Sequence, residues 1–149
     1  MVAGVTGKYC AGKSTLARIL TGEYGFLEID VDKLGHRALE EKDREIISAF
    51  GDEIVSGGGI DRKKLGDIVF SDRRALERLE SIVHPAMRTR VVEFIENHPG
   101  EDIVVNAAVL FTMRLEELCD FVILVDAPLL KRIRRARVRD GLSLFQIVR

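Results

Sequence analysis

A glycine-rich segment near the N-terminus restricts the fold of this chain more than any other feature. Residues 7–14 read Gly-Lys-Tyr-Cys-Ala-Gly-Lys-Ser, which matches the pattern G-x-x-x-x-G-K-[ST] in full. The apolar run Met1–Thr6 before it is typical of a buried strand, and residues 12–24 after it carry apolar side chains at helical spacing, with Gly25 as a C-cap. Between a strand and a helix, the backbone N–H groups of such a loop point at one spot and attract an anion. The segment therefore predicts a P-loop, the phosphate cradle of many nucleotide-binding enzymes.

The residues of this loop have separate predicted roles. Lys13 is expected to reach the β- and γ-phosphates of ATP, and the Ser14 hydroxyl is placed to hold Mg²⁺. The predicted nucleotide site comprises Gly7, Lys8, Cys10, Ala11, Gly12, Lys13, Ser14 and Thr15. Cys10 is unusual, because many such loops carry glycine at this position. If the backbone there needs a positive φ, cysteine costs roughly 1 kcal/mol of strain.

Further apolar runs of strand length follow the loop and its helix, at residues 26–30, 103–110 and 121–125. Strands that alternate with helices predict a parallel sheet covered on both faces. We therefore expect an α/β chain with the three-layer P-loop nucleoside triphosphate hydrolase fold.

The chain is long enough for one packed domain, and we expect three parts within residues 1–149. The core covers about 1–34 and 101–130, a helical insertion covers about 35–100, and the start of a lid covers about 131–149. Within the insertion, Ser71 is a good N-cap for a helix that runs through Ile82. Pro85 is expected to begin the next helix.

The composition is that of an ordinary soluble protein, with 46% hydrophobic and 32% charged residues. The net charge is -1, so no global field favours nucleic acid or an anionic membrane. We expect no secretory leader, and the sequence contains no apolar run of the roughly 20 residues that a membrane-spanning helix needs. Two cysteines far apart in sequence fit a reducing cytosol. We expect a cytoplasmic enzyme, a monomer or weak homo-oligomer, that acts on a small molecule and binds neither nucleic acid nor membrane.

Asp30 and Asp32 lie at the C-terminal end of the second predicted strand, at the edge of the sheet that faces the ligand crevice beside the loop. Phosphoryl transfer to an alcohol needs a group that orients the hydroxyl and accepts its proton. Asp32 is either this group or the N-cap of the following helix, and its position beside Asp30 leaves both interpretations open. Asn106 lies in the third predicted strand, where many P-loop enzymes keep a magnesium-binding acid. It can hold a magnesium-bound water but brings no charge.

A run of cations follows the last predicted strand. Six of the nine residues from Lys131 to Arg139 are Lys or Arg. A nucleic-acid surface would normally come with a basic overall charge, and a solvated helix face would leave six like charges to repel one another. An arginine lid over a triphosphate explains both the clustering and its place just after a strand, so we favour the lid.

Several segments resemble the bacterial dephospho-coenzyme A kinase family. Ile29-Asp30-Val31-Asp32-Lys33 with His36 is similar to the family's IDADKIAH segment. The other similar segments are the opening at residues 4–15, residues 60–70 (family IDRxxLGxIVF), residues 79–85 (LExIVHP) and residues 139–143, after the lid arginines. The matches come in the family's order and span essentially the whole chain.

The resemblance implies ATP-dependent phosphorylation of the ribose 3′-hydroxyl of dephospho-coenzyme A, which gives coenzyme A and ADP. It makes Asp32, Lys13 and Arg139 catalytic residues, with Asp32 as the base or orienter of the hydroxyl. It places Arg62 and His84 beside Asp32 in the acceptor-binding site. The phosphate-clamping lid would comprise Arg132, Arg135 and Arg139.

The chain departs from the family pattern in three places. Cys10 replaces the usual glycine, and residues 106–112 (Asn-Ala-Ala-Val-Leu-Phe-Thr) stand where many members have DxPLLFE. Family members also continue past the position of Arg149. The resemblance therefore predicts a C-terminally truncated chain with strand order 2-3-1-4, without a fifth strand, whose segment 121–125 is an exposed sheet edge.

Two alternative functions stay open at this point. The chain could be another P-loop small-molecule or nucleotide kinase of the same architecture. It could also be a truncated nucleotide-binding module without turnover. A GTPase fits less well, because the sequence contains no N-K-x-D motif.

Overall fold

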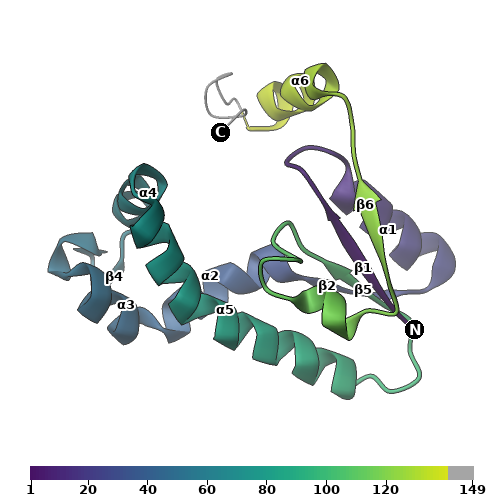
Figure 1. The fold of residues 1–149 in the computed structure, drawn as a ribbon, viewed down its shortest axis with the longest axis horizontal. Helices are drawn as coiled ribbons and strands as arrows, with labels where there is room; N and C mark the ends of the chain where they lie inside the picture. Colours follow the sequence, from purple (N-terminus) through teal and green to yellow (C-terminus); the bar gives the residue numbers. More distant parts are fainter. Residues whose placement is uncertain (141–149) are drawn as a thin grey trace. The chain divides into compact units, whose positions relative to one another are not determined.

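Figure 1 shows the chain as a computed structural model, which describes residues 1–140 and the side chains of residues 1–138. The chain divides into two compact units. The sheet unit comprises Met1–Val31 and the chain from Phe94 onward, and the helical unit comprises Asp32–Glu93. None of the helices within the described residues is long and apolar enough to cross a membrane.

Four parallel strands form the sheet, in the order β2-β5-β1-β6. They are β1 (Val2–Gly7), β2 (Leu27–Asp30), β5 (Ile103–Asn106) and β6 (Phe121–Val125). In chain order this is 2-3-1-4, so the predicted fold class and strand order are confirmed. The parallel register aligns the carboxyl ends of the strands at one edge, because Asn106 pairs with both Val5 and Asp30, and Gly7 pairs with Val125.

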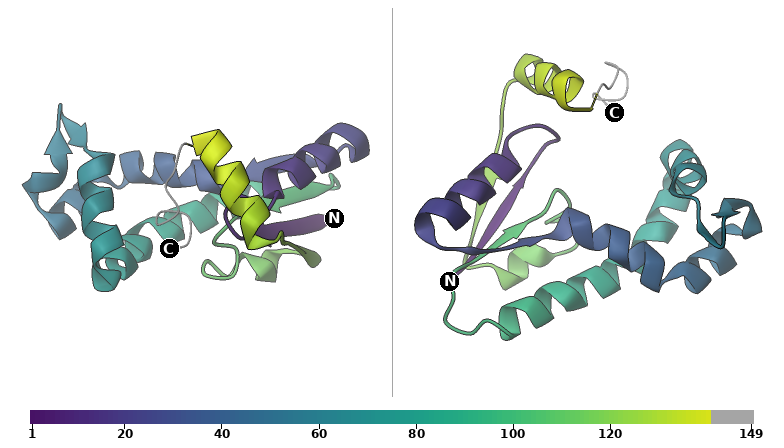
Figure 2. Two further views of the ribbon diagram at one scale, coloured as in Figure 1. Left: turned by 90° about the horizontal axis from the view of Figure 1, so that it is seen from above. Right: turned by 180° about the vertical axis from the view of Figure 1, so that it is seen from behind.

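The central strands β1 and β5 are buried because helical segments pack on both faces of the sheet. Each residue from Ile103 to Ala107 is at most 3% exposed. The helix α1 (Lys13–Tyr24) packs on β1 and β5 and ends at Gly25 in the left-handed conformation (φ 75°), as the sequence predicts. The short 3₁₀ helix η2 (Leu115–Leu118) packs against β1, and Figure 2 shows it on the face opposite α1.

The predicted strand 103–110 is too long. Pairing ends at Asn106, and residues 108–114 form turns, with Arg114 in the left-handed region (φ 53°). The apolar run continues because Leu110 is fully buried over the sheet, close to Gly4. The apolar residues that follow β5 therefore cover a face of the sheet and do not lengthen the strand.

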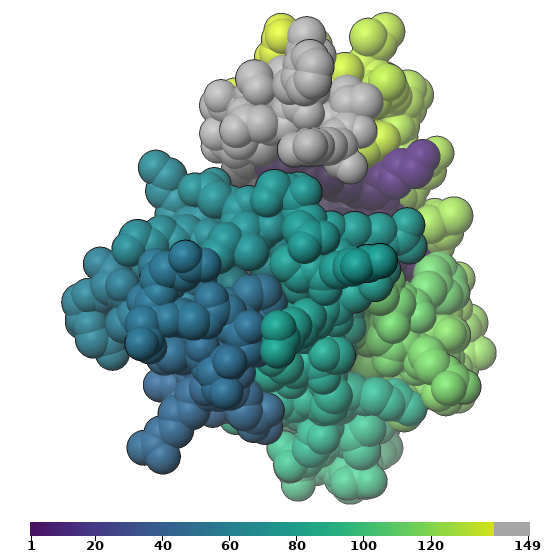
Figure 3. All heavy atoms as spheres, turned by 60° about the vertical axis from the view of Figure 1, so that its left-hand side comes forward, coloured from purple at the N-terminus to yellow at the C-terminus, as the bar shows by residue number. Residues whose placement is uncertain are grey.

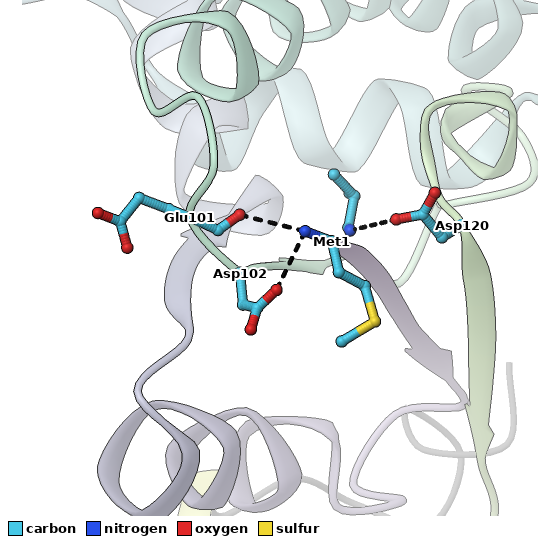
Figure 4. A network of polar contacts seen from close by, with 5 residues as sticks. Met1, Glu101, Asp102 and Asp120 are labelled. Atoms are coloured by element: carbon cyan, nitrogen blue, oxygen red, sulfur yellow. Dashed lines mark hydrogen bonds and ion pairs between the residues drawn. The ribbon is translucent and has the colours of Figure 1, made fainter.

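Polar contacts align the opposite edge of the sheet, where the strands begin (Figure 4). The Met1 ammonium lies 3.0 Å from the Asp102 carboxylate and donates to the Glu101 carbonyl. The Val2 N–H donates to Asp120 Oδ2 at 2.7 Å. These contacts join the start of β1 to the residues that precede β5 and β6.

The helical unit contains helices and one small hairpin. Its elements are α2 (Val31–Glu41), α3 (Asp43–Phe50), η1 (Asp52–Ile54), β3 (Val55–Ser56), β4 (Gly59–Ile60), α4 (Arg62–Ser71) and α5 (Arg73–Glu96). Its core contains Ala38, Ile46, Ile54, Leu65, Val69, Val83, Met87 and Val91, all less than 9% exposed. The blue and teal atoms of this unit form one packed body in Figure 3.

Two predicted helix boundaries in this unit are wrong. Ser71 is the last residue of α4, and Asp72 instead accepts a hydrogen bond from the Arg74 N–H at the start of α5 (2.9 Å). Pro85 does not begin a helix but lies inside α5. Proline removes one backbone hydrogen bond there, and the buried stripe of Val83, Met87 and Val91 on both sides of it holds the helix together.

Candidate active site

The loop after β1 has the backbone geometry of a phosphate cradle. Gly7 and Gly12 have φ values of 152° and 123°, which side-chain-bearing residues rarely adopt. A Cβ atom on Gly7 would lie 2.1 Å from the Val125 carbonyl oxygen, so β6 leaves no room for any other residue. The Ala11 N–H donates to the Lys8 carbonyl (3.1 Å) and closes the turn.

A lysine and a helix N-terminus converge on this loop. The Lys13 ammonium donates to the Gly7 carbonyl at 3.0 Å, which holds its charge against the loop. Gly12 at the N-cap of α1 offers no side-chain acceptor to the first N–H groups of the helix. Ser14 and Thr15 are exposed in the first turn. A helix N-terminus without a side-chain cap, beside an ammonium group, suits a phosphate group, so these residues fit the predicted anion.

Cys10 adopts the left-handed conformation, with φ 57°. The strain expected at this residue requires a positive φ, and Cys10 has one. The expected cost is about 1 kcal/mol relative to glycine. The thiol of Cys10 is half-buried.

Two arginines of α6 (Leu129–Asp140) lie on the same loop. Arg132 Nε donates to the Tyr9 carbonyl at 2.9 Å. Arg135 Nη1 donates to the carbonyls of Cys10 (3.2 Å) and Ala11 (3.0 Å). The structure thus brings two of the three predicted lid arginines to the P-loop. The side chain of Arg139 lies outside the described residues.

A polar pair lies at the carboxyl edge of the sheet beside β1. Asn106 is 3% exposed, and its Nδ2 donates to Glu28 Oε1 at 2.9 Å. Its Oδ1 is buried and accepts no hydrogen bond from the described residues. Sequence reasoning missed Glu28, although it stands two residues before Asp30 and a strand places residues two apart on one face. An asparagine with a carboxylate partner therefore occupies the position where an acid was expected.

Asp32 lies inside a helix. Strand β2 ends at Asp30 and α2 begins at Val31, so Asp32 is the second residue of that helix and exposed. The strand does not continue, and Asp32 is not at the N-cap position. Of the two interpretations of this acid, the capping one is thus disfavoured.

The other two predicted acceptor residues also lie in the helical unit. Arg62 begins α4, and its Nη2 donates to Glu40 Oε1 at 2.9 Å. His84 lies half-buried in α5. Burial lowers the pKa of His84 below its usual range, and the nearby Glu80 carboxylate opposes this effect.

The second cysteine, Cys119, follows η2 and is half-buried. Its Sγ–H donates to the Leu115 carbonyl at 3.3 Å. Burial, with the nearby Asp120 and Glu116 carboxylates, raises the pKa of the Cys119 thiol to about 11. This thiol is therefore protonated at neutral pH.

A parallel sheet with a glycine cradle, an embedded lysine and a helix N-terminus defines a P-loop nucleotide-binding protein. Residues 1–149 match the family model described as dephospho-CoA kinase, and the chain belongs to that family. A dephospho-CoA kinase from Borreliella burgdorferi is 41% identical over 128 residues, which are 85% of this chain and 62% of the relative. A dephospho-CoA kinase from Thermus thermophilus is 35% identical over 148 residues, which are 99% of this chain and 72% of the relative.

Solved structures agree with this assignment. The crystal structure of TT1252 from Thermus thermophilus superposes with a TM-score of 0.87 at 36% identity, over 99% of this chain and 76% of that one. A dephospho-CoA kinase from Campylobacter jejuni has a TM-score of 0.67 at 31% identity, with the same coverage. The chain spans 62% and 65% of the lengths of the Borreliella burgdorferi and Borrelia garinii relatives.

Proposed function

We propose that this chain transfers the γ-phosphoryl group of ATP to the ribose 3′-hydroxyl of dephospho-coenzyme A, giving coenzyme A and ADP. The observation that carries the proposal is the match of all 149 residues to the dephospho-CoA kinase family. The geometry of the P-loop adds independent support, because it suits a phosphate ligand at the carboxyl edge of a parallel sheet.

The loop residues would bind and orient the triphosphate. The N–H groups at the start of α1 and the Lys13 ammonium lie where phosphate charge would be compensated. Lys8, Cys10, Ala11 and Thr15 would complete this nucleotide site. Gly7 and Gly12 permit the backbone conformation in which the loop would present these donors to the nucleotide.

Ser14 would hold Mg²⁺ through its hydroxyl. When bound, Mg²⁺ would neutralise charge that develops on the β- and γ-phosphate oxygens. The described residues contain no cluster of three or more His, Cys, Asp or Glu side chains that could hold a metal ion. This fits Mg²⁺, which protein sites commonly bind through few protein ligands together with substrate phosphates and water.

The acceptor would be handled by the helical unit. Asp32 would orient the 3′-hydroxyl and accept its proton as the oxygen bonds to the γ-phosphorus and ADP leaves. Arg62 and His84 would contribute to binding of dephospho-coenzyme A, and Arg139 would stabilise charge on the transferring group. We further propose that the enzyme acts in the cytoplasm, as a monomer or weak homo-oligomer, without nucleic acid or membrane; the net charge of -1 supports this.

The test is an ADP-release assay with Mg·ATP and dephospho-coenzyme A. Asp32→Asn should lower turnover by about 100-fold or more while Mg·ATP binding persists, because the loss of a proton acceptor affects chemistry first. Asp67→Asn removes the same charge from an exposed position in α4 and should leave turnover unchanged. ADP release with a different alcohol, but none with dephospho-coenzyme A, would contradict the proposal. Unchanged turnover in Asp32→Asn would remove only this residue from the mechanism.

A further inference from the structure

The helix α6 is attached to the P-loop through the loop's carbonyl groups. Figures 1 and 2 show α6 beside the turn that joins β1 to α1. Arg132 and Arg135 donate to the carbonyls of three consecutive residues, Tyr9, Cys10 and Ala11, at 2.9 to 3.2 Å. Ala136, which follows Arg135 on α6, is completely buried. Both guanidinium groups are therefore engaged by protein carbonyls.

These contacts determine where the loop's N–H groups point. In a trans peptide the carbonyl and the following N–H point in opposite directions, and the described chain has no cis peptide bond. An arginine on the Tyr9 carbonyl thus turns the Cys10 N–H away from α6. An arginine on the Ala11 carbonyl does the same for the Gly12 N–H. The anion-binding side of the loop is the side that faces away from the two arginines.

The arginine hydrogen bonds also lie at and beside Cys10, a residue of the loop that has a side chain and adopts the left-handed conformation. Cys10 has φ 57°, a conformation that glycine adopts without strain and a residue with a Cβ does not. Arg135 bonds the carbonyl of Cys10 itself and that of the next residue. Hydrogen bonds from a charged donor are among the stronger ones in proteins, so they can hold this residue in place.

We propose that Arg132 and Arg135 are positioning residues that brace the carbonyl side of the P-loop and make Cys10 tolerable at a glycine position. They act on the phosphate through the loop and do not clamp it directly. This inference rests on the proposed function in one respect, namely that the braced loop binds a nucleotide. It assigns the two arginines a different role from the phosphate clamp that the sequence suggested.

The test is a double-mutant cycle between Cys10→Gly and Arg135→Gln, with the Kd for Mg·ATP measured by calorimetry. Arg135→Gln should weaken binding by about tenfold, because the unbraced Cys10 leaves its strained conformation. Cys10→Gly alone supplies the reference Kd for the second background, because glycine adopts this backbone conformation without strain. In the Cys10→Gly background, Arg135→Gln should raise the Kd for Mg·ATP by about threefold or less, because glycine keeps the loop in the same shape without the arginine contacts. Arg134→Gln, which removes the same charge from an exposed position on α6, should change the Kd by less than about twofold.

A second readout needs no nucleotide. The Ala11 N–H is hydrogen-bonded to the Lys8 carbonyl within the loop, so its hydrogen exchange, followed by NMR, reports on the loop's shape. Exchange should become faster in Arg135→Gln and return to the original rate when Cys10→Gly is added. If the Arg135 variant does not fold, Arg132→Gln tests the same brace at the Tyr9 carbonyl.

Three results would separate the alternatives. Arg135→Gln could lower the Mg·ATP affinity equally in the original chain and in the Cys10→Gly variant, and more for ATP than for ADP. That result would indicate that Arg135 contacts the phosphate directly, and it would overturn the proposed brace. Unchanged exchange of the Ala11 N–H in Arg135→Gln would overturn it without reference to any ligand. Failure of the original chain to bind Mg·ATP would contradict the proposed function, while the exchange experiment would still decide on the brace.

Discussion

The sheet unit and the helical unit are stabilised in different ways. In the sheet unit, close backbone packing positions the site: β5 is buried along its length, and Gly7 lies so close to β6 that a single carbon atom does not fit. In the helical unit, a modest apolar core is joined by exposed ion pairs between helices, such as Arg62–Glu40 and Arg90–Glu41. Exposed ion pairs contribute little on average, whereas added atoms in a packed backbone cost much. The same kind of substitution should therefore have very different consequences in the two units.

The largest difference is expected between two glycine-to-alanine substitutions. Gly7→Ala places a Cβ 2.1 Å from the Val125 carbonyl and should destabilise the protein by about 3 kcal/mol or more, with loss of nucleotide binding. Gly35→Ala in α2 meets only Met87, at 3.7 Å, and should stabilise by up to about 1 kcal/mol, because alanine favours helix. Chemical denaturation measures both. Similar stability of the two variants would contradict the contrast between the units.

A smaller effect is expected at the polar pair of the sheet unit. Asn106→Asp places a second carboxylate within hydrogen-bond distance of Glu28, and should destabilise by about 1–3 kcal/mol. Adding Glu28→Gln restores a donor–acceptor pair with the partners exchanged and should recover most of the stability. A double variant as unstable as Asn106→Asp would show that the two side chains do not depend on each other.

The helical unit offers a pH-dependent test at His84. Its pKa is lowered by burial, so the folded chain binds its proton less readily than the unfolded chain does. Stability from this residue is complete above the ordinary pKa of about 6.5 and decreases as the pH falls toward the lowered value. His84→Gln should flatten the stability profile in this window, measured as Tm against pH. An unchanged profile would show that His84 is hydrated in solution.

The smallest effect is expected at the exposed ion pair of Arg90 with Glu41. The hydrogen bond from Arg90 lowers the pKa of the Glu41 carboxyl, so any stability from the pair is present above the ordinary pKa and lost as the pH falls below it. Arg90→Gln should lower the Tm only slightly, and raising the salt concentration to about 0.5 M should remove the difference. A large, salt-independent loss would mean that ion pairs carry more of this unit's stability than their exposure indicates.

The sequence predicted the sheet unit better than the helical unit, for a physical reason. A phosphate loop requires glycines, a lysine and a helix start at fixed spacing, and the buried strands beside it are continuous apolar runs, so both leave clear patterns. In the helical unit, Ser71 and Pro85 are good local signals for helix starts. Neither marked one, because Asp72 supplied the capping acceptor and packing carried α5 through the proline.

Side-chain contacts between distant segments could not be predicted from spacing. Arg135 and Cys10 are far apart in sequence, and nothing in the run of cations indicated that two of its members would bind loop carbonyls. The hydrogen bond between Asn106 and Glu28 likewise depends on the pairing of β2 with β5, which the spacing of the two residues in the sequence does not indicate. The roles of Asp32, Arg62 and His84 stay predictions for the activity assays to decide.

The high pKa of Cys119 makes the chain suitable for selective chemical labelling. The thiolate is the reactive form, and a pKa of about 11 leaves about 100-fold less of it at neutral pH than in an ordinary cysteine, so Cys119 should react slowly with alkylating reagents. The sequence contains one other cysteine, Cys10, in the nucleotide loop. A maleimide dye or spin label attached at neutral pH would therefore report mainly from the loop, and protection of that thiol by a bound nucleotide could be followed without introducing any new residue.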